Sequence, residues 1–238
     1  MIVLFTDFGT RDPYVGQVKA RLAEQAPGQQ VVDLLHEAPD YNPHAGAHLI
    51  AAFAPVFPPG CTFLAVVDPG VGTPRGAVVV LAGGHWFVGP DNGLLSVIAA
   101  RHADSKVWRI TWAPAGVSST FHGRDLFAPI AAAIARGEFP TDKLTPIDTL
   151  EVEFDAGDLA RVIYIDHFGS AWTGVLNADT DCSARLTLGS RLATLLSEPS
   201  SGRSLVRMQT RSSVDITFRN LRVDVLVLPV FVAYRQAI

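Results

Sequence analysis

Short apolar runs alternate with helix-like segments through about the first 140 residues of the chain. A short apolar run bounded by turn residues is typical of a buried strand. Such runs cover Ile2–Phe5, Val31–Leu35, Thr62–Val67, Ala77–Leu81, Trp86–Val88 and Val107–Ile110. Because strands that alternate with helices build layered domains, the pattern predicts an α/β domain with a Rossmann-like sheet.

Between these runs, apolar residues recur at helical spacing. The first helix is expected to begin near Asp12, which can cap it, with Pro13 in its first turn. Further helices are expected over His44–Phe53, Leu94–His102 and Leu126–Arg136. For the last of them, Asp125 is the expected N-cap and Gly137 the residue that ends it.

The pattern changes after about residue 140. Residues 138–158 are rich in Pro, Thr, Asp and Glu without clear periodicity, which is typical of a linker. Short alternating segments without intervening helices follow, and they predict a small antiparallel barrel or sandwich. They cover Arg161–Ile165, Trp172–Leu176, Ala184–Leu188, Leu205–Met208, Val214–Phe218 and Val223–Leu228. We expect an α/β domain over 1–145, a linker over 146–158 and an all-β domain over 159–238.

Composition narrows the classes of function. Of the 238 residues, 48% are hydrophobic and 18% charged, which favours a folded chain over a disordered one. The net charge of -4 gives no reason to expect nucleic-acid or anionic-membrane binding. The chain runs from Met1 directly into a strand-like segment, and its apolar runs are shorter than the ~20 residues of a spanning helix. We therefore expect a cytoplasmic protein that binds neither nucleic acid nor membranes.

A turn with ionisable side chains follows the apolar run that ends at Val67. Asp68-Pro69-Gly70-Val71-Gly72 forces a tight turn, so the Asp68 carboxylate is expected to project over the edge of the sheet. Arg75 could fold back across this turn as a permanent cation beside the carboxylate or a bound water. Alternatively, Asp68 is an ordinary turn residue and Arg75 an ordinary surface residue.

A second turn of this kind contains His122, between Phe121 and Gly123 and just ahead of an expected helix. An aromatic neighbour and a helix N-terminus both favour a neutral imidazole, which can act as a base or an acceptor. The other interpretation is a packed polar side chain without a chemical role. The three residues together would offer an acid or base (Asp68), a fixed cation (Arg75) and a titratable imidazole ring (His122).

Further candidates follow other strands. Asp7 could accept hydrogen bonds from a ribose diol, or it could simply be a turn residue. The turn Gly89–Gly93 is interpreted as architecture, with Asp91 or Asn92 capping the next helix. The segment Ile165–Trp172 combines a carboxylate, aromatic rings and a hydroxyl, which suit a purine and an ammonium group but equally an ordinary hairpin.

In this order, these stretches resemble the S-adenosyl-L-methionine hydrolase (adenosine-forming) family, which is related to the fluorinase and chlorinase enzymes. The matching pieces are TDFG (6–9), DPGVG…R (68–75), GPDNG (89–93), STFHGRD (119–125) and IDHFG (165–169). The resemblance implies an N-terminal α/β domain, a C-terminal β-barrel and a homotrimer. Its active sites would lie between the first domain of one subunit and the second domain of its neighbour. The implied substrate is the small molecule S-adenosyl-L-methionine, with no cofactor and no metal.

The resemblance also implies roles for single residues. Asp68, Arg75 and His122 match the trio that surrounds the attacking water. The positions that match substrate contacts are Asp7, Asp12, Tyr41, Phe121, Gly123, Asp166, Phe168, Ser170, Trp172, Ser212 and Asp215.

Within that set, different parts of the substrate are assigned to different residues. Asp7 and Asp12 would bind the ribose, and Tyr41 would pack on the nucleoside. Asp166 would hold the methionine ammonium, while Phe168 and Trp172 would flank the adenine. Ser212 and Asp215 come from a closing segment, 211–217, that departs from the family pattern.

Three other functions compete with this hypothesis. A halogenase could use the same scaffold, although a nearby carboxylate such as Asp68 would repel a halide. A metal-dependent hydrolase could be built from Asp7, Asp68, Asp91 and His122, since hard cations favour carboxylates, but no compact ligand motif is present. A protein that binds the nucleoside without turning it over is the third.

Overall fold

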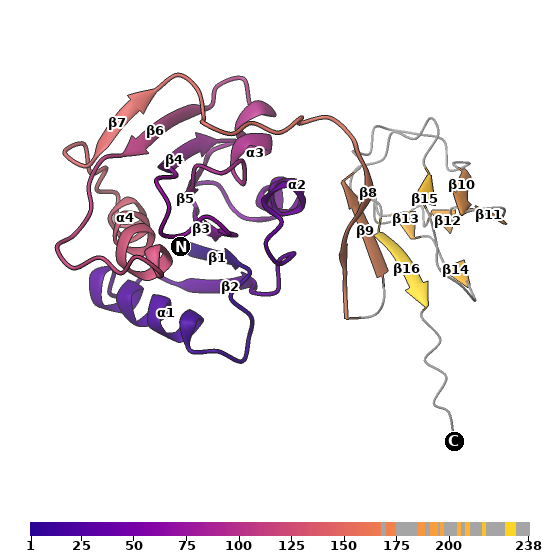
Figure 1. Ribbon diagram of the computed structural model, residues 1–238, viewed down its shortest axis with the longest axis horizontal. Coiled ribbons are helices and arrows are strands. Elements are labelled where there is room, and N and C mark those ends of the chain that lie inside the picture. Colours follow the sequence, from indigo (N-terminus) through magenta and orange to yellow (C-terminus); the bar gives the residue numbers. More distant parts are fainter. Residues whose placement is uncertain are drawn as a thin grey trace. The chain divides into compact units, whose positions relative to one another are not determined.

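The computed structural model describes residues 1–167 and, beyond them, the strands at 170–174, 185–188, 191–194, 196–197, 204–205, 208–209, 216–217 and 227–231. The chain divides into two compact units, Met1–Ala156 and Gly157–Ile238 (Figure 1). Each unit is described by itself below. Among the described residues, no helix has the length and apolar character needed to cross a membrane.

In the first unit, seven strands form one mixed sheet with the order β2-β1-β3-β5-β4-β6-β7. The strands are β1 (Ile2–Thr6), β2 (Val31–Leu35), β3 (Thr62–Val66), β4 (Ala77–Ala82), β5 (His85–Pro90), β6 (Lys106–Ile110) and β7 (Leu144–Ile147). Strand β1 pairs in parallel with β2 and β3, and β3 pairs in parallel with β5. The pairs β4–β5, β4–β6 and β6–β7 are antiparallel. The α/β class is confirmed, and the parallel pairing is confined to one side of the sheet.

A two-glycine turn explains where the parallel pattern stops. Gly83 and Gly84 connect β4 to β5, and their φ angles are +56° and +77°. A two-residue hairpin loop of this type requires positive φ at both positions, which glycine adopts without strain. The turn therefore forces β4 to run antiparallel to β5.

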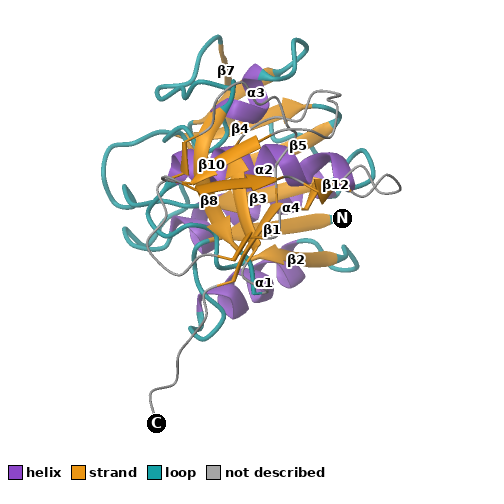
Figure 2. Cartoon of the chain, turned by 90° about the vertical axis from the view of Figure 1, so that its right-hand side faces the viewer, coloured by secondary structure: helices purple, strands orange, loops and turns teal. Residues whose placement is uncertain are grey.

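Helices cover both faces of this sheet. They are α1 (Tyr14–Gln25), α2 (Pro43–Phe53), the 3₁₀ turn η1 (Ala54–Val56), α3 (Ser96–Ala100), the π-helical turn η2 (Gly123–Phe127) and α4 (Ala128–Ala135). Helices α1 and α4 lie together on one face, and α2 and α3 on the other (Figures 1 and 2). Ile2 and Leu4 join the core under α1 and α4, whereas Phe5 lies against Gly46 of α2. Burial of both faces explains why these strands are apolar throughout.

Two predicted helix caps are not formed. Helix α1 begins at Tyr14, directly after Pro13, and no side chain caps it, so the exposed Asp12 has no capping role. Asp125 lies inside the π-helical turn rather than at the start of α4. Its carboxylate instead accepts hydrogen bonds from Arg124, at 2.6 and 2.8 Å. An adjacent guanidinium has displaced the capping role that the sequence suggested.

The turn at 89–93 also differs from the prediction. Asn92 does not cap α3: its amide Nδ2 donates to the Val67 carbonyl at 2.9 Å, and its Oδ1 accepts from the Leu94 N–H at 3.2 Å. Asp91 does not cap the helix either, because its Oδ1 accepts from the Glu151 N–H at 3.0 Å. Both side chains therefore fasten the turn to other segments, and not to the helix after it.

The end of α4 was predicted correctly. Gly137 has a φ of +82°, and its N–H donates to the Ile134 carbonyl at 2.9 Å. The Glu138 N–H donates to the Ala133 carbonyl at 3.0 Å. These two bonds form a Schellman motif, in which a glycine takes the left-handed position that ends the helix.

Residues 146–156 belong to the first unit, which differs from the predicted linker over 146–158. Glu151 accepts a hydrogen bond from Arg109 Nη1 at 2.5 Å, in addition to its backbone contact with Asp91. The Phe154 ring stacks on His44 with their centroids 4.4 Å apart. The first two residues of the segment belong to β7, and beyond them isolated contacts attach it, so it carries no apolar periodicity that a sequence pattern could reveal. The predicted domain limits stay predictions.

Most of the described residues of the second unit lie in strands. They are β8 (Leu159–Ile165), β9 (Ser170–Gly174), β10 (Arg185–Leu188), β11 (Arg191–Thr194), β12 (Leu196–Ser197), β13 (Ser204–Leu205), β14 (Met208–Gln209), β15 (Ile216–Thr217) and β16 (Val227–Phe231). As described, one sheet has the order β11-β10-β15, and a second has the order β12-β13-β16-β9-β8 with β14 beside β16. Whether these sheets close into the predicted barrel stays a prediction.

The close approach of β3 and β5 yields a first test. A Cβ at Gly89 would lie 2.3 Å from the Ala65 carbonyl oxygen, so we expect Gly89→Ala to lower the free energy of unfolding by about 1–3 kcal/mol through overpacking. Gly16 in α1 has open space at its Cβ position, so Gly16→Ala should be neutral or stabilise by roughly 0.5–1 kcal/mol. Urea denaturation measures both. Equal stability of the two variants would contradict this account of the strand spacing.

Candidate active site

Two carboxylates lie at the edge of the sheet where β1 and β3 end. The strands pair in parallel with Thr6 opposite Val66; Asp7 comes one residue after Thr6, and Asp68 two residues after Val66. The Asp7 N–H donates to the Val66 carbonyl at 3.1 Å, which extends the pairing by one residue. Because the carboxyl ends of parallel strands share an edge, both side chains reach the same space.

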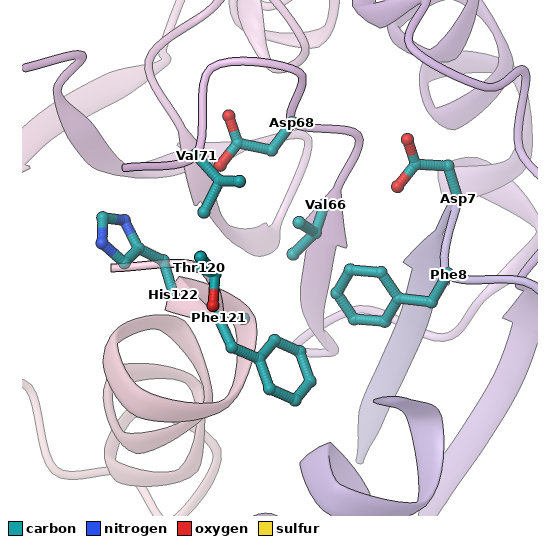
Figure 3. A pocket seen from close by; sticks show the side chains of 9 residues that line it. Asp7, Phe8, Val66, Asp68, Val71, Thr120, Phe121 and His122 are labelled. Carbon is teal, nitrogen blue, oxygen red and sulfur yellow. The ribbon is translucent and has the colours of Figure 1, made fainter. Parts of the chain in front are cut away.

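A pocket of about 60 Å³ opens at this edge. Its lining consists of Asp7, Phe8, Val66, Asp68, Val71, Thr120, Phe121, His122 and Gly123. Figure 3 shows Asp7 and His122 on opposite sides, with the rings of Phe8 and Phe121 side by side along another wall. Apolar walls with a few convergent polar groups are typical of a small-molecule site.

Asp68, Arg75 and His122, which come from separate motifs, lie in direct contact. Arg75 Nε donates to the two Asp68 carboxylate oxygens at 2.9 and 3.0 Å, and Nη2 donates to Oδ2 as well. The same Nη2 lies 3.0 Å from His122 Nδ1. The Asp68 and Arg75 side chains are only 4% and 10% exposed, so this ion pair is shielded from solvent.

The contact with Arg75 determines which nitrogen of His122 carries the proton. A guanidinium has no acceptor, so Nδ1 must accept the bond and the neutral ring is protonated at Nε2. Burial, followed by the charge of Arg75, lowers the pKa of His122 below its ordinary value. The ring is therefore neutral at pH 7, with an N–H donor at Nε2.

The carboxyl group of Asp7, in the pocket lining, has a raised pKa. Its pKa is raised to about 6: burial is the main cause, the charges of Asp40 and Asp68 contribute in the same direction, and the hydrogen bond from the Tyr41 N–H partly offsets them. The Tyr41 N–H lies 3.5 Å from Asp7 Oδ2. Tyr41 holds this position with a φ of +54°, which is uncommon for a residue other than glycine. Its own side chain is 78% exposed and does not line the pocket.

Two glycines permit the close approach of the loops around the pocket. A Cβ at Gly123 would lie 2.9 Å from Phe8 Cζ, inside the aromatic wall. Gly72 has a φ of +80°, and a Cβ there would lie 2.6 Å from the Ser119 carbonyl oxygen. The loop after β3 and the loop before His122 could not lie this close with larger residues.

The aromatic wall is supported from behind. Phe8 meets Phe121 edge to face, with centroids 5.6 Å apart, and Tyr14 meets Phe121 at 5.3 Å. The guanidinium of Arg124 lies over the Phe121 ring at 5.1 Å, and its Nη1 donates to Gln17 at 2.6 Å. This wall is therefore fixed to α1 as well as to the π-helical turn.

The other predicted site residues have different positions. Asp12 is exposed and does not line the pocket. In the second unit, Trp172 Nε1 donates to Asp166 Oδ2 at 3.3 Å. The residues that lie outside the described part of the chain, or whose side chains do, are Phe168, Ser170, Ser212 and Asp215.

Sequence reasoning missed four lining residues: Phe8, Val66, Val71 and Thr120. Phe8, Val71 and Thr120 lie inside the matching motifs, but they are not ionisable, so their residue types gave no signal of a chemical role. Within the described part of the chain, no three His, Cys, Asp or Glu side chains are grouped so that they could hold a metal ion.

Comparisons with known proteins identify a family and several relatives. Residues 2–145 match the family model described as the SAM hydroxide adenosyltransferase N-terminal domain. An (R)-S-adenosyl-L-methionine hydrolase of Thermus thermophilus is 40% identical over 196 residues, which are 74% of this chain and 75% of that protein. Another, from Methanocaldococcus jannaschii, is 35% identical over 185 residues, 74% of this chain and 66% of that one.

Solved structures are similar too. An uncharacterized conserved protein of Thermotoga maritima matches with a TM-score of 0.72 at 28% identity, covering 88% of this chain and 83% of that one. A conserved hypothetical protein of Thermus thermophilus matches with a TM-score of 0.62 at 36% identity, covering 81% of this chain and 79% of that one.

The raised pKa of Asp7 predicts a pH-dependent loss of stability. A carboxyl group with a folded-state pKa of about 6, against 3.8 in the unfolded chain, destabilises the fold as the pH rises through this window. We therefore expect Asp7→Asn to melt at a higher temperature than the parent at pH 7. The difference should disappear below about pH 4, where both states carry the proton.

Thermal unfolding at pH 7 and at pH 3.5 measures this difference. Asp12→Asn is the control, because Asp12 is exposed and outside the pocket. A parent that is at least as stable as Asp7→Asn at pH 7 would show that burial does not penalise this carboxylate.

Proposed function

The chain belongs to the SAM hydroxide adenosyltransferase family, and we propose that it hydrolyses S-adenosyl-L-methionine with water at C5′ to give adenosine and L-methionine. The names of its relatives support this substrate and reaction. The observation that carries the proposal is the contact of Asp68, Arg75 and His122 at the rim of a pocket that also contains Asp7.

In the proposed reaction, water attacks C5′ in line with the bond to the sulfonium sulfur. The electron pair of that bond stays on sulfur, which leaves as neutral thioether, so the leaving group needs no acid. The difficult requirement is a competent nucleophile. Correct alignment of the attacking oxygen supplies much of the rate acceleration.

The contacts within the trio assign its members different roles. The lone pair of His122 Nδ1 faces Arg75, so the ring offers the water an N–H at Nε2 and no second acceptor. The Asp68 carboxylate is then the group that accepts the proton of the water. The guanidinium of Arg75 stabilises the developing hydroxide. Asp7 is placed to accept hydrogen bonds from the ribose hydroxyls.

The proposal extends to the second unit and to assembly. Asp166 and Trp172 would contact the methionine and adenine parts, and a homotrimer would combine the first domain of one subunit with the barrel of its neighbour. The small pocket supports this, because ligand pockets usually measure roughly 300–1,000 Å³. Light scattering tests it: a mass of one or two subunits of 25.5 kDa would contradict the trimer.

We propose the cytoplasm as the location of the protein, which fractionation of cells tests.

Product analysis tests the function itself. We expect purified protein and S-adenosyl-L-methionine in ¹⁸O-labelled water to give adenosine with one ¹⁸O at the 5′ hydroxyl. The assay contains chloride and is repeated with EDTA. A 5′-chlorinated nucleoside would indicate a halogenase, and loss of activity in EDTA a metal-dependent hydrolase. Binding of adenosine without any product would indicate a nucleoside-binding protein.

Substitutions in the trio test the roles. We expect Asp68→Asn, which removes the proton acceptor, and His122→Asn, which removes the N–H that orients the water, to lower kcat by about 10²–10⁴-fold with KM nearly unchanged. The asparagine at position 122 can still accept from Arg75 but lacks the Nε2–H. His102→Asn is the control, because that ring lies beside Gly83, outside the pocket. Parental turnover in either trio variant would refute the assigned roles.

A further inference from the structure

The buried ring of Phe127 contacts two members of the trio, Arg75 and His122. The Arg75 guanidinium carbon lies 5.3 Å from the centre of this ring. The His122 ring meets it edge to face, with centroids 6.5 Å apart at 87°. Phe127 itself is 0% exposed, so it has no contact with solvent and does not line the pocket.

The hydrogen bonds of Arg75 only weakly restrain the tilt of its guanidinium plane. Its bonds to Asp68, to His122 and, through Nη1, to the Gly76 carbonyl at 2.9 Å lie along the N–H directions, in the plane of the guanidinium. Such bonds fix the position of the group within its plane but resist tilting only weakly. An aromatic face against the guanidinium adds a cation–π contact that opposes the tilt. In the observed orientation, Nη2 reaches Asp68 and His122 together.

The π-helical turn explains how Phe127 comes to this place. In a regular α-helix, residues five apart point about 140° away from each other, which would separate Phe127 from His122. Here the Ala128 N–H bonds to the Gly123 carbonyl, five residues back, and the turn is wider. The wider turn brings His122 and Phe127 to the same side, and π-helical turns of this kind recur at functional sites.

We propose that Phe127 is a positioning residue of the active site, whose ring holds the Arg75 guanidinium in the plane that joins Asp68 to His122. Phe127 touches neither substrate nor water and acts through Arg75. This inference deepens the proposed function and depends on it for its kinetic test, but not for its spectroscopic one.

The kinetic test replaces the Phe127 ring with an apolar side chain of similar volume that has no aromatic face. Leu and Met are apolar and close to Phe in volume, so Phe127→Leu and Phe127→Met are expected to fold. We expect both to lower kcat roughly 10- to 100-fold, the usual effect of a displaced catalytic group, with KM changed less than about twofold. Phe87→Leu is the matched control, because Phe87 is also 0% exposed but stacks on Phe63 in the opposite core layer.

The spectroscopic test needs no substrate. Titration of the His122 ring by NMR, assigned by its loss in His122→Asn, reports the charges around it: Arg75, Asp68 and Asp125. If Arg75 tilts away, its repulsion weakens and Nδ1 becomes free to take a proton, so the pKa of His122 should rise in both Phe127 variants and stay unchanged in Phe87→Leu. Burial also lowers this pKa, so looser packing raises it too. The ¹⁵N shift of His122 Nδ1 separates the two causes, because it changes only when the hydrogen bond from Arg75 is lost.

Parental kcat and an unshifted His122 in the Phe127 variants would overturn the inference, as would equal effects in Phe87→Leu. If the unsubstituted protein forms no adenosine, that result refutes the proposed function and leaves the inference about Phe127 to the other test. The titration of His122 then still decides whether Phe127 positions Arg75.

Discussion

The ion pair between Asp68 and Arg75 is the interaction on which the pocket depends. Both side chains are almost buried, and a charge withdrawn from water is tolerated only when a partner and further hydrogen bonds compensate for it. Every neighbour of the pair is accordingly constrained: His122 must present a lone pair to Arg75, and the Gly76 carbonyl must accept from it. The loop after β3 and the turn before α4 are joined through this pair.

The sequence revealed the components of the site better than their assembly. The run of apolar residues up to Val67, followed by a glycine-rich turn, was sufficient to place Asp68 at the end of a central strand. Arg75 could be assigned to the same turn because it lies only seven residues away. His122 is 47 residues beyond Arg75, and no local pattern fixes a contact at that separation. The chemistry of the three side chains suggested grouping His122 with Asp68 and Arg75, and the resemblance of motifs implied that they surround one water.

The parts that could not be predicted share a physical cause. Asp125 has the sequence features of a helix cap, but Arg124 beside it offers two charged hydrogen bonds, and the chain forms a π-helical turn instead. Glu151 lies in an acidic, proline-containing stretch that is typical of a linker, yet its bonds to Arg109 and Gly76 fasten that stretch to the first unit. In both cases one side chain has specific partners in place of the role that the local pattern indicated, and periodicity contains no record of such contacts.

The charges of the pocket also favour binding of the proposed substrate over binding of its thioether product. Asp68 and Arg75 cancel each other, His122 is neutral, and Asp7 with a pKa of about 6 is mostly ionised at neutral pH. The pocket lining therefore has a net negative charge, which attracts a sulfonium cation and repels a halide. Once the bond to C5′ breaks, the sulfur is neutral and this attraction is lost. The buried Asp7 carboxylate, which costs stability at neutral pH, thus favours the charged substrate over the neutral thioether product.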